Sequence, residues 1–198
     1  MKIINLTRDS DTYTSNVYFL LGDWKAVDDV NALIDVGRDR SIIEKIKGLD
    51  TGVGKKQVEK VVVTHGHYDH MSLLPAIRDE FGPEVCAFHS FAGVNHLLRD
   101  GESLRLADRS FEVIHTPGHT NDSICLYCEQ DGVLFSGDTT LIITTTDGSY
   151  QEGFISALER IARKNITAIY PGHGEPITSN VKHLLYASLD NVRKSKKI

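Results

Sequence analysis

The segment covering residues 64–70 constrains this chain more than any other, because it places three histidines and an aspartate directly behind an apolar run. It reads Thr-His-Gly-His-Tyr-Asp-His and follows three consecutive valines at 61–63. Imidazole and carboxylate groups together are the ligands that borderline divalent metals such as zinc and iron prefer. A buried strand that ends in such a cluster presents it at the rim of a sheet. We therefore expect a metal site there, in preference to a solvated surface run.

Three further ligand candidates lie downstream, each in a turn that follows an apolar, strand-like run. They are His119 in Thr-Pro-Gly-His-Thr, Asp138 in Phe-Ser-Gly-Asp-Thr and His173 in Tyr-Pro-Gly-His-Gly. A glycine beside the ligand lets the backbone turn sharply and approach a metal closely. Three such turns after the first cluster predict that distant parts of the chain meet at one centre.

Length, charge and cysteine content narrow the class of protein. The chain has 198 residues, 40% of them hydrophobic and 25% charged, as expected for a single folded domain over 1–198. The net charge of −5 offers no basic surface for a nucleic acid backbone. We find neither a signal peptide nor a membrane span and expect a cytoplasmic protein that acts on a small molecule, with its oligomeric state left open.

The hydrophobic pattern predicts strands dominating the first third and recurring in the last, with helices between. The expected strands cover 2–6, 15–21, 26–30, 32–36, 59–64, 84–88, 103–106, 110–115, 122–128, 132–136 and 166–170. The expected helices cover 41–47, 90–99 and about 150–164. A further one is capped by Asp69 or Ser72 and runs to about 81, and a last one starts at 179 or 180. We expect Ser41 and Glu44 to form a capping box, and Pro75 to lie in a first helical turn.

The cysteines and the histidines outside these motifs are not predicted to belong to the site. Cys125 and Cys128 lie three apart on a predicted strand, so they point to opposite faces and are expected to be buried thiols rather than a redox or zinc pair. The odd number of cysteines indicates reduced thiols. Four histidines lie outside the motifs and are interpreted as surface or core residues: His89, His96, His115 and His183.

At this point the chain resembles the metallo-β-lactamase superfamily, from about residue 4 to residue 173. The quoted motifs match the five sequence signatures of that family in order, with Asp35 of Leu-Ile-Asp-Val-Gly as the first. The resemblance implies a four-layer αββα sandwich of class α/β (α+β), which periodicity alone does not select. Within the family the chain looks most similar to hydroxyacylglutathione hydrolase (glyoxalase II).

Carried onto this chain, the resemblance implies two metal ions of zinc, with iron or manganese as alternatives. Metal 1 takes His65, His67 and His119. Metal 2 takes Asp69, His70 and His173, and Asp138 bridges the two. Paired cations lower the pKa of a shared water toward 7 and polarise a carbonyl, and Asp69 can also orient the resulting bridging hydroxide and accept a proton. The implied activity is hydrolysis of a small ester, thioester or lactone.

Residues near the motifs have supporting roles in this hypothesis. Thr64, Thr120 and Asp35 are candidates to fix imidazole tautomers. Tyr68 either lines the mouth of the site or packs as an ordinary aromatic residue. The Thr-rich stretch 139–150 is expected to shape the pocket, and 144–150 to form a flexible flap.

Several alternatives stay open. The stretch after His173 has room for one helix, which argues against glutathione thioesters in particular. A mononuclear iron persulfide dioxygenase would keep a similar motif but bind iron through His65, His119 and Asp138 alone. A nuclease or phosphodiesterase and a non-enzymatic binding protein are weaker alternatives, because the chain is acidic and its ligand set is complete. A flavodiiron protein is weaker still, since those proteins generally carry Glu where His67 stands.

Overall fold

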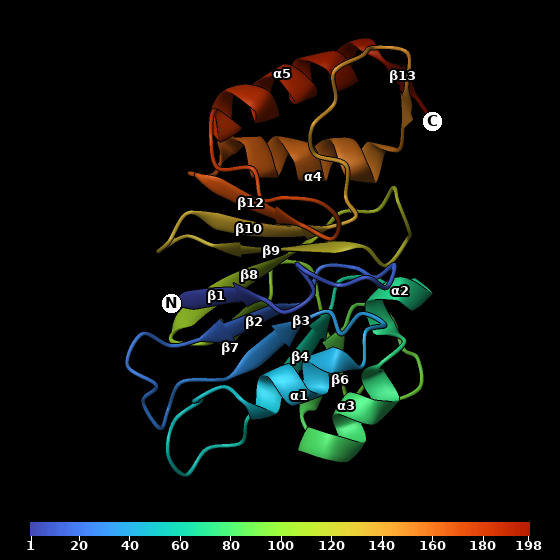
Figure 1. The fold of residues 1–198 in the computed structure, drawn as a ribbon. Helices are drawn as coiled ribbons and strands as arrows, with labels where there is room; N and C mark the ends of the chain where they lie inside the picture. Colours follow the sequence, from blue (N-terminus) through green and yellow to red (C-terminus); the bar gives the residue numbers. More distant parts are fainter.

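Two β-sheets stacked face to face, with helices on both outer faces, form the architecture of the computed structural model, which describes residues 1–198 (Figure 1). The first sheet has six strands in sequence order. They are β1 (Lys2–Asn5), β2 (Tyr18–Leu21), β3 (Ala32–Ile34), β4 (Lys60–Val63), β5 (Glu84–Ala87) and β6 (His96–Leu97). From β3 to β6 the strands run parallel, whereas β1, β2 and β3 are antiparallel neighbours.

The second sheet has five strands and is mostly antiparallel. Its order is β12 (Ala168–Pro171), β10 (Val133–Gly137), β9 (Ile124–Cys128), β8 (Arg109–His115) and β7 (Ser103–Leu106). The only parallel pair joins β10 to β12. Because β8 and β10 both run antiparallel to β9, the carboxyl ends of β8, β10 and β12 meet at one edge.

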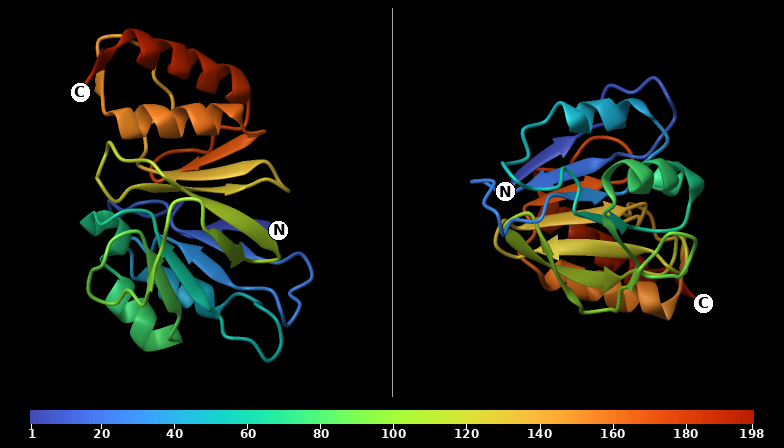
Figure 2. Two further views of the ribbon diagram at one scale, coloured as in Figure 1. Left: turned by 180° about the vertical axis from the view of Figure 1, so that it is seen from behind. Right: turned by 90° about the horizontal axis from the view of Figure 1, so that it is seen from below.

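Helices cover the outer face of each sheet, as Figures 1 and 2 show from three directions. On the first sheet lie α1 (Ser41–Lys47), α2 (Tyr68–Met71) and α3 (Leu74–Phe81), and on the second lie α4 (Glu152–Arg163) and α5 (Val181–Lys194). A small parallel pair, β11 (Ser149–Tyr150) with β13 (Lys196–Lys197), brings the end of the chain beside the start of α4. None of these helices is both long and apolar enough to cross a lipid bilayer.

Alternation of side chains along the strands produces three apolar layers. Residues facing between the sheets, such as Val62 and Phe135, form the central layer. Their sequence neighbours point outward, where Val61 packs under α1 and α3 and Leu134 packs under α4 and α5. The αββα sandwich implied by the family resemblance is therefore confirmed.

The predicted separation of the two strand cysteines is confirmed as well. Cys125 belongs to the layer beneath α4 and α5, whereas Cys128 belongs to the layer between the sheets. All three cysteines are buried free thiols, and burial raises the pKa of Cys125 to about 11. These thiols have the character of packing residues.

Two predicted elements are wrong. The segment 26–30 is not a strand, because the Asp29 carboxylate accepts a hydrogen bond from the Ala26 N–H (2.8 Å) and stabilises a turn. The segment 90–99 is not a helix. Gly93 lies at φ +101°, outside the helical region, and the Asn95 side chain accepts a hydrogen bond from the Val85 N–H, so that the chain leads into the edge strand β6.

Two local details also differ from the predictions. The helix expected to start at Asp69 or Ser72 is two helices, α2 and α3. They are separated at Leu73, whose ψ of 0° is not helical, and Pro75 does occupy the first turn of α3. The capping box at α1 is absent, because Arg40 rather than Ser41 holds the N-cap position. The Ser41 N–H donates to the Asp39 carboxylate (2.9 Å).

The packing of α4 yields a test of the outer apolar layer. Leu158 of α4 is fully buried between this helix and the second sheet, whereas Leu97 of β6 is half exposed. Leu158→Ala should lower the free energy of unfolding by about 2–5 kcal/mol, because it leaves a cavity. Leu97→Ala should lower it by less than about 1 kcal/mol. Urea denaturation measures both, and equal losses would contradict this packing.

Candidate metal centre

The seven predicted site residues come together where strand ends of both sheets meet. His65, His67, Asp69 and His70 follow the carboxyl end of β4 in the first sheet. His119, Asp138 and His173 follow β8, β10 and β12, whose ends share one edge of the second sheet. A hydrogen bond from the Ile124 N–H to the Thr64 carbonyl (3.0 Å) ties the two sheets together at this point.

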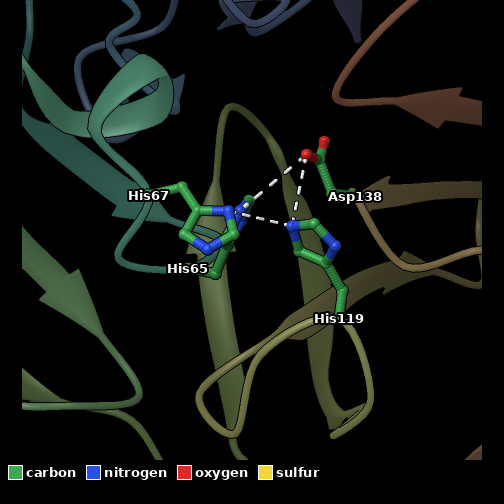
Figure 3. A group of neighbouring side chains, drawn as sticks. All are labelled: His65, His67, His119 and Asp138. Atoms are coloured by element: carbon green, nitrogen blue, oxygen red, sulfur yellow. Dashed lines mark hydrogen bonds and ion pairs between the residues drawn. The ribbon is translucent and has the colours of Figure 1, made fainter.

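The ligand atoms form two groups. Within each group the potential ligand atoms lie within 4.8 Å of one another: His65, His67, His119 and Asp138 in the first, and Asp69, His70 and His173 in the second. In the first, His67 Nδ1 lies 2.9 Å from His119 Nε2 (Figure 3). In the second, His173 Nε2 lies 3.1 Å from Asp69 Oδ2.

Asp138 belongs to the first group and also reaches the second. Its Oδ2 is 3.5 Å from His119 Nε2 and 3.6 Å from His173 Nε2, and its Oδ1 is 3.2 Å from His70 Nε2. Figure 3 shows the carboxylate directed toward His65 and His119. One carboxylate thus reaches imidazoles of both groups, which is the geometry a shared ligand requires.

A buried aspartate, Asp35, determines how two of the imidazoles are oriented. Its carboxylate accepts hydrogen bonds from His70 Nδ1 (2.8 Å) and from the Thr64 hydroxyl (2.8 Å). Because the Thr64 hydroxyl proton is used there, its oxygen accepts from His65 Nδ1, at 3.2 Å. Both rings therefore donate through Nδ1 and turn Nε2 toward Asp138.

Three atoms at the centre of the cluster are buried without a hydrogen-bond partner: His65 Nε2, His70 Nε2 and Asp138 Oδ1. The 3.2 Å approach of the last two brings them close, but their orientation does not make a hydrogen bond. Buried polar atoms without partners are costly in a protein interior. A cation among them would satisfy all three, so this donor set fits a divalent metal.

Charge is unevenly distributed within the cluster. Burial lowers the pKa of His65 to about 4, and His70 adds to this effect. Burial opposes a charged His70, but Asp35 and Asp138 outweigh burial and raise the pKa of His70 to about 10. Burial would raise the pKa of Asp138, yet His70 outweighs it and holds that pKa at about 2. A bound cation would take the place of the proton on His70.

Two glycines allow the strand ends to approach this closely. A Cβ on Gly172 would lie 2.2 Å from Asp138 Oδ1 and 2.7 Å from His70 Cε1. Gly137 lies at φ +49°, and a Cβ there would be 2.7 Å from the Thr64 hydroxyl oxygen. Both positions therefore require glycine, because any Cβ would overlap neighbouring atoms. At Gly137 the positive φ favours glycine as well.

A cavity of about 440 Å³ opens beside the cluster. Its polar end contains His119, Asp138 and His173, and its walls are mainly aliphatic and threonine side chains. The wall residues include Thr139, Thr140, Leu141, Ile142, Ile169 and Ile177. The first part of the Thr-rich stretch therefore does line the pocket. The volume suits a small organic molecule.

The predictions for residues near the motifs are confirmed in part. Thr64 does contact a site histidine, but the Thr120 hydroxyl shares a hydrogen bond with the Ser123 hydroxyl (2.6 Å) instead. Tyr68 is 59% exposed at the rim rather than packed in the core. Of the histidines outside the motifs, His96 pairs with Glu84 and Glu102 away from this cluster.

Two residues beside the site were missed by the sequence analysis. The ring of Tyr13 stacks on His173, with centroids 5.7 Å apart and an interplanar angle of 15°. The Arg38 guanidinium donates to the Tyr13 carbonyl and to the Tyr68 hydroxyl, both at 3.1 Å. Nothing in the sequence signals Tyr13, which lies in a loop far from the motifs. The only signal for Arg38 was its position directly after the Asp-Val-Gly segment.

Comparison with known families identifies this arrangement. The sequence model described as the metallo-beta-lactamase superfamily matches residues 11–94 and 90–173, which cover most of the chain and all seven site residues. The chain belongs to the metallo-beta-lactamase superfamily.

Individual relatives resemble this chain at modest sequence identity. A hydroxyacylglutathione hydrolase of Hydrogenovibrio crunogenus is 30% identical over 142 residues, covering 70% of this chain and 49% of that protein. A probable hydroxyacylglutathione hydrolase of Schizosaccharomyces pombe is 36% identical over 135 residues, covering 63% and 51%. The chain thus spans about half the length of these relatives. The structure of ETHE1 from Myxococcus xanthus has the same fold, with a TM-score of 0.70 at 23% identity, over 96% of this chain and 88% of that one.

The hydrogen bonds of Asp35 provide a test of the site geometry. Asp35→Asn should weaken zinc binding about 10–100-fold, because an amide cannot accept all three hydrogen bonds from Thr64 and His70. Asparagine tolerates the left-handed backbone at this position, where φ is +58°. Competition with a chromophoric chelator measures the affinity. Asp39→Asn, four residues away, is the matched control, and an equal loss there would contradict a specific role for Asp35.

Proposed function

We propose that this protein is a metal-dependent hydrolase with a dinuclear, zinc-type centre that cleaves a small ester, thioester or lactone. The observation that carries the proposal is the position of Asp138 between two groups of ligand atoms, with His65 Nε2 and His70 Nε2 directed at it without other partners. The hydrolase names of the curated relatives support the same class of reaction.

Each group would hold one ion. In the proposal His65, His67 and His119 bind the first and Asp69, His70 and His173 the second, with Asp138 shared. When bound, such a pair supplies a water of lowered pKa and a Lewis acid for a carbonyl oxygen. Nearly all of Asp69 is buried, and its carboxylate contacts His173, so it is placed to orient the attacking water and to accept its proton.

The cavity beside the cluster supports a small acyl substrate. Leu141, Ile142 and Ile169 provide an apolar wall next to His119 and Asp138. An acyl chain packed against this wall would place the substrate carbonyl at the ligand cluster. The chain would also displace water from the cluster. The Ser136 hydroxyl donates to the carbonyl of its neighbour Gly137, and the three cysteines are buried free thiols, so the proposal gives none of them the role of nucleophile.

Metal content is the first test. Elemental analysis of the purified protein should find about two zinc ions per chain. Removal of the metal with a chelator should abolish hydrolysis of an ester, thioester and lactone panel, and zinc should restore it. About one iron per chain, with oxygen uptake on a glutathione persulfide, would instead favour the dioxygenase.

The shared carboxylate can be tested separately. Asp138→Ala should lower both the metal content and the rate of hydrolysis, because one side chain serves both ions. The control is His96→Ala, which removes a histidine that pairs with carboxylates away from the cluster and should change neither. Equal metal loading in wild type and Asp138→Ala would contradict the proposed bridge.

A further inference from the structure

Arg38 is fixed at the rim of the metal centre by its backbone. It follows β3 through Gly37, whose N–H donates to the carbonyl of His70 (3.0 Å). Its own N–H donates to the Thr14 hydroxyl (2.9 Å). The position of Arg38 is therefore coupled to the backbone of a candidate metal ligand and to the loop that carries Tyr13.

The guanidinium group is held on one side only. Nη1 donates to the Tyr13 carbonyl and to the Tyr68 hydroxyl, and the guanidinium carbon lies 4.6 Å from the centroid of the Tyr68 ring. Nε and Nη2 make no hydrogen bond within the protein, and no carboxylate lies within ion-pair distance. By contrast, Arg109 and Arg160 each pair with two or more acidic side chains.

The surroundings of Arg38 are open to a ligand. Tyr13 is 66% exposed and Tyr68 is 59% exposed, although both are large aromatic residues. Tyr13 stacks on His173, and Tyr68 directly precedes Asp69 in the chain. Two exposed rings and one partly satisfied cation thus lie next to the ligand cluster.

We propose that Arg38 binds a carboxylate group of the substrate and so selects anionic acyl compounds. A planar guanidinium with free Nε and Nη2 donors matches the two oxygens of a carboxylate in a bidentate pair. The contacts of Nη1 hold this edge in place before a ligand arrives, which reduces the entropy lost on binding. The substrate is then an ester, thioester or lactone that also carries a carboxylate.

This inference rests on the proposed hydrolase function, but binding of inert ligands tests it separately. The probes are the monoanilides of succinic, glutaric and adipic acids, each compared with the neutral anilide of the same chain length. Amides of this kind keep the carbonyl but resist cleavage. NMR titration of the zinc-loaded protein measures both affinities, and the series of chain lengths finds the reach between the metal centre and Arg38.

Wild-type protein should bind the acid at least about tenfold more tightly than its neutral counterpart at one of these lengths. Arg38→Gln should abolish that preference, and Arg38→Lys should restore part of it. The control is Arg40→Gln, which removes a nearby exposed arginine that makes no ion pair and should keep the preference.

Three results would overturn the inference: no preference in the wild type, an undiminished preference in Arg38→Gln, or an equal loss of acid and neutral binding. The last would assign Arg38 a purely structural role. The matching phenyl esters are assayed in parallel. Failure to cleave them would count against the hydrolase function alone, because the anilide affinities decide the role of Arg38 independently.

Discussion

The carboxylate of Asp35 is the group on which the geometry of the metal centre depends. It is buried and can only accept hydrogen bonds, so the Thr64 hydroxyl and His70 Nδ1 must both donate to it. Because the Thr64 hydroxyl donates to Asp35, its oxygen accepts from His65 Nδ1, so Asp35 also determines the orientation of His65. A single buried acceptor thereby sets the direction of two imidazoles, and their Nε2 atoms are left without any partner except a cation.

The stacking of the two sheets explains why these groups can meet. Four of the seven ligands follow a strand of the first sheet, and the other three follow three strands of the second. Parallel pairing of β10 with β12 places Asp138 beside His173, and the glycines at the strand ends remove the Cβ atoms that would keep the sheets apart. Buried side chains pack between the two sheets, and a site supported by such packing favours a preorganised centre.

Two different surroundings adjoin the centre. The cavity with its aliphatic wall contains His119, Asp138 and His173, and Tyr13, which stacks on the same His173, is joined to Arg38 and Tyr68 by hydrogen bonds. An apolar wall and a guanidinium near one centre suit a molecule with an acyl chain and an anionic end. The acidic balance of the whole chain gives no indication of this local positive charge.

The sequence by itself determined the αββα class, through the family motifs, and the identity of the residues that gather at the strand ends. It also placed most strands, because alternating or continuous apolar runs reflect burial directly. It did not determine the segments 26–30 and 90–99, where the side chains of Asp29 and Asn95 bond to the backbone and override local propensity. Only the tertiary structure decided that Asp35 orients His65 and His70, and that Tyr13 and Arg38 lie at the rim. These contacts join residues far apart in the chain. A local sequence pattern cannot predict them, because it does not specify which strand ends will lie at the same edge of the structure.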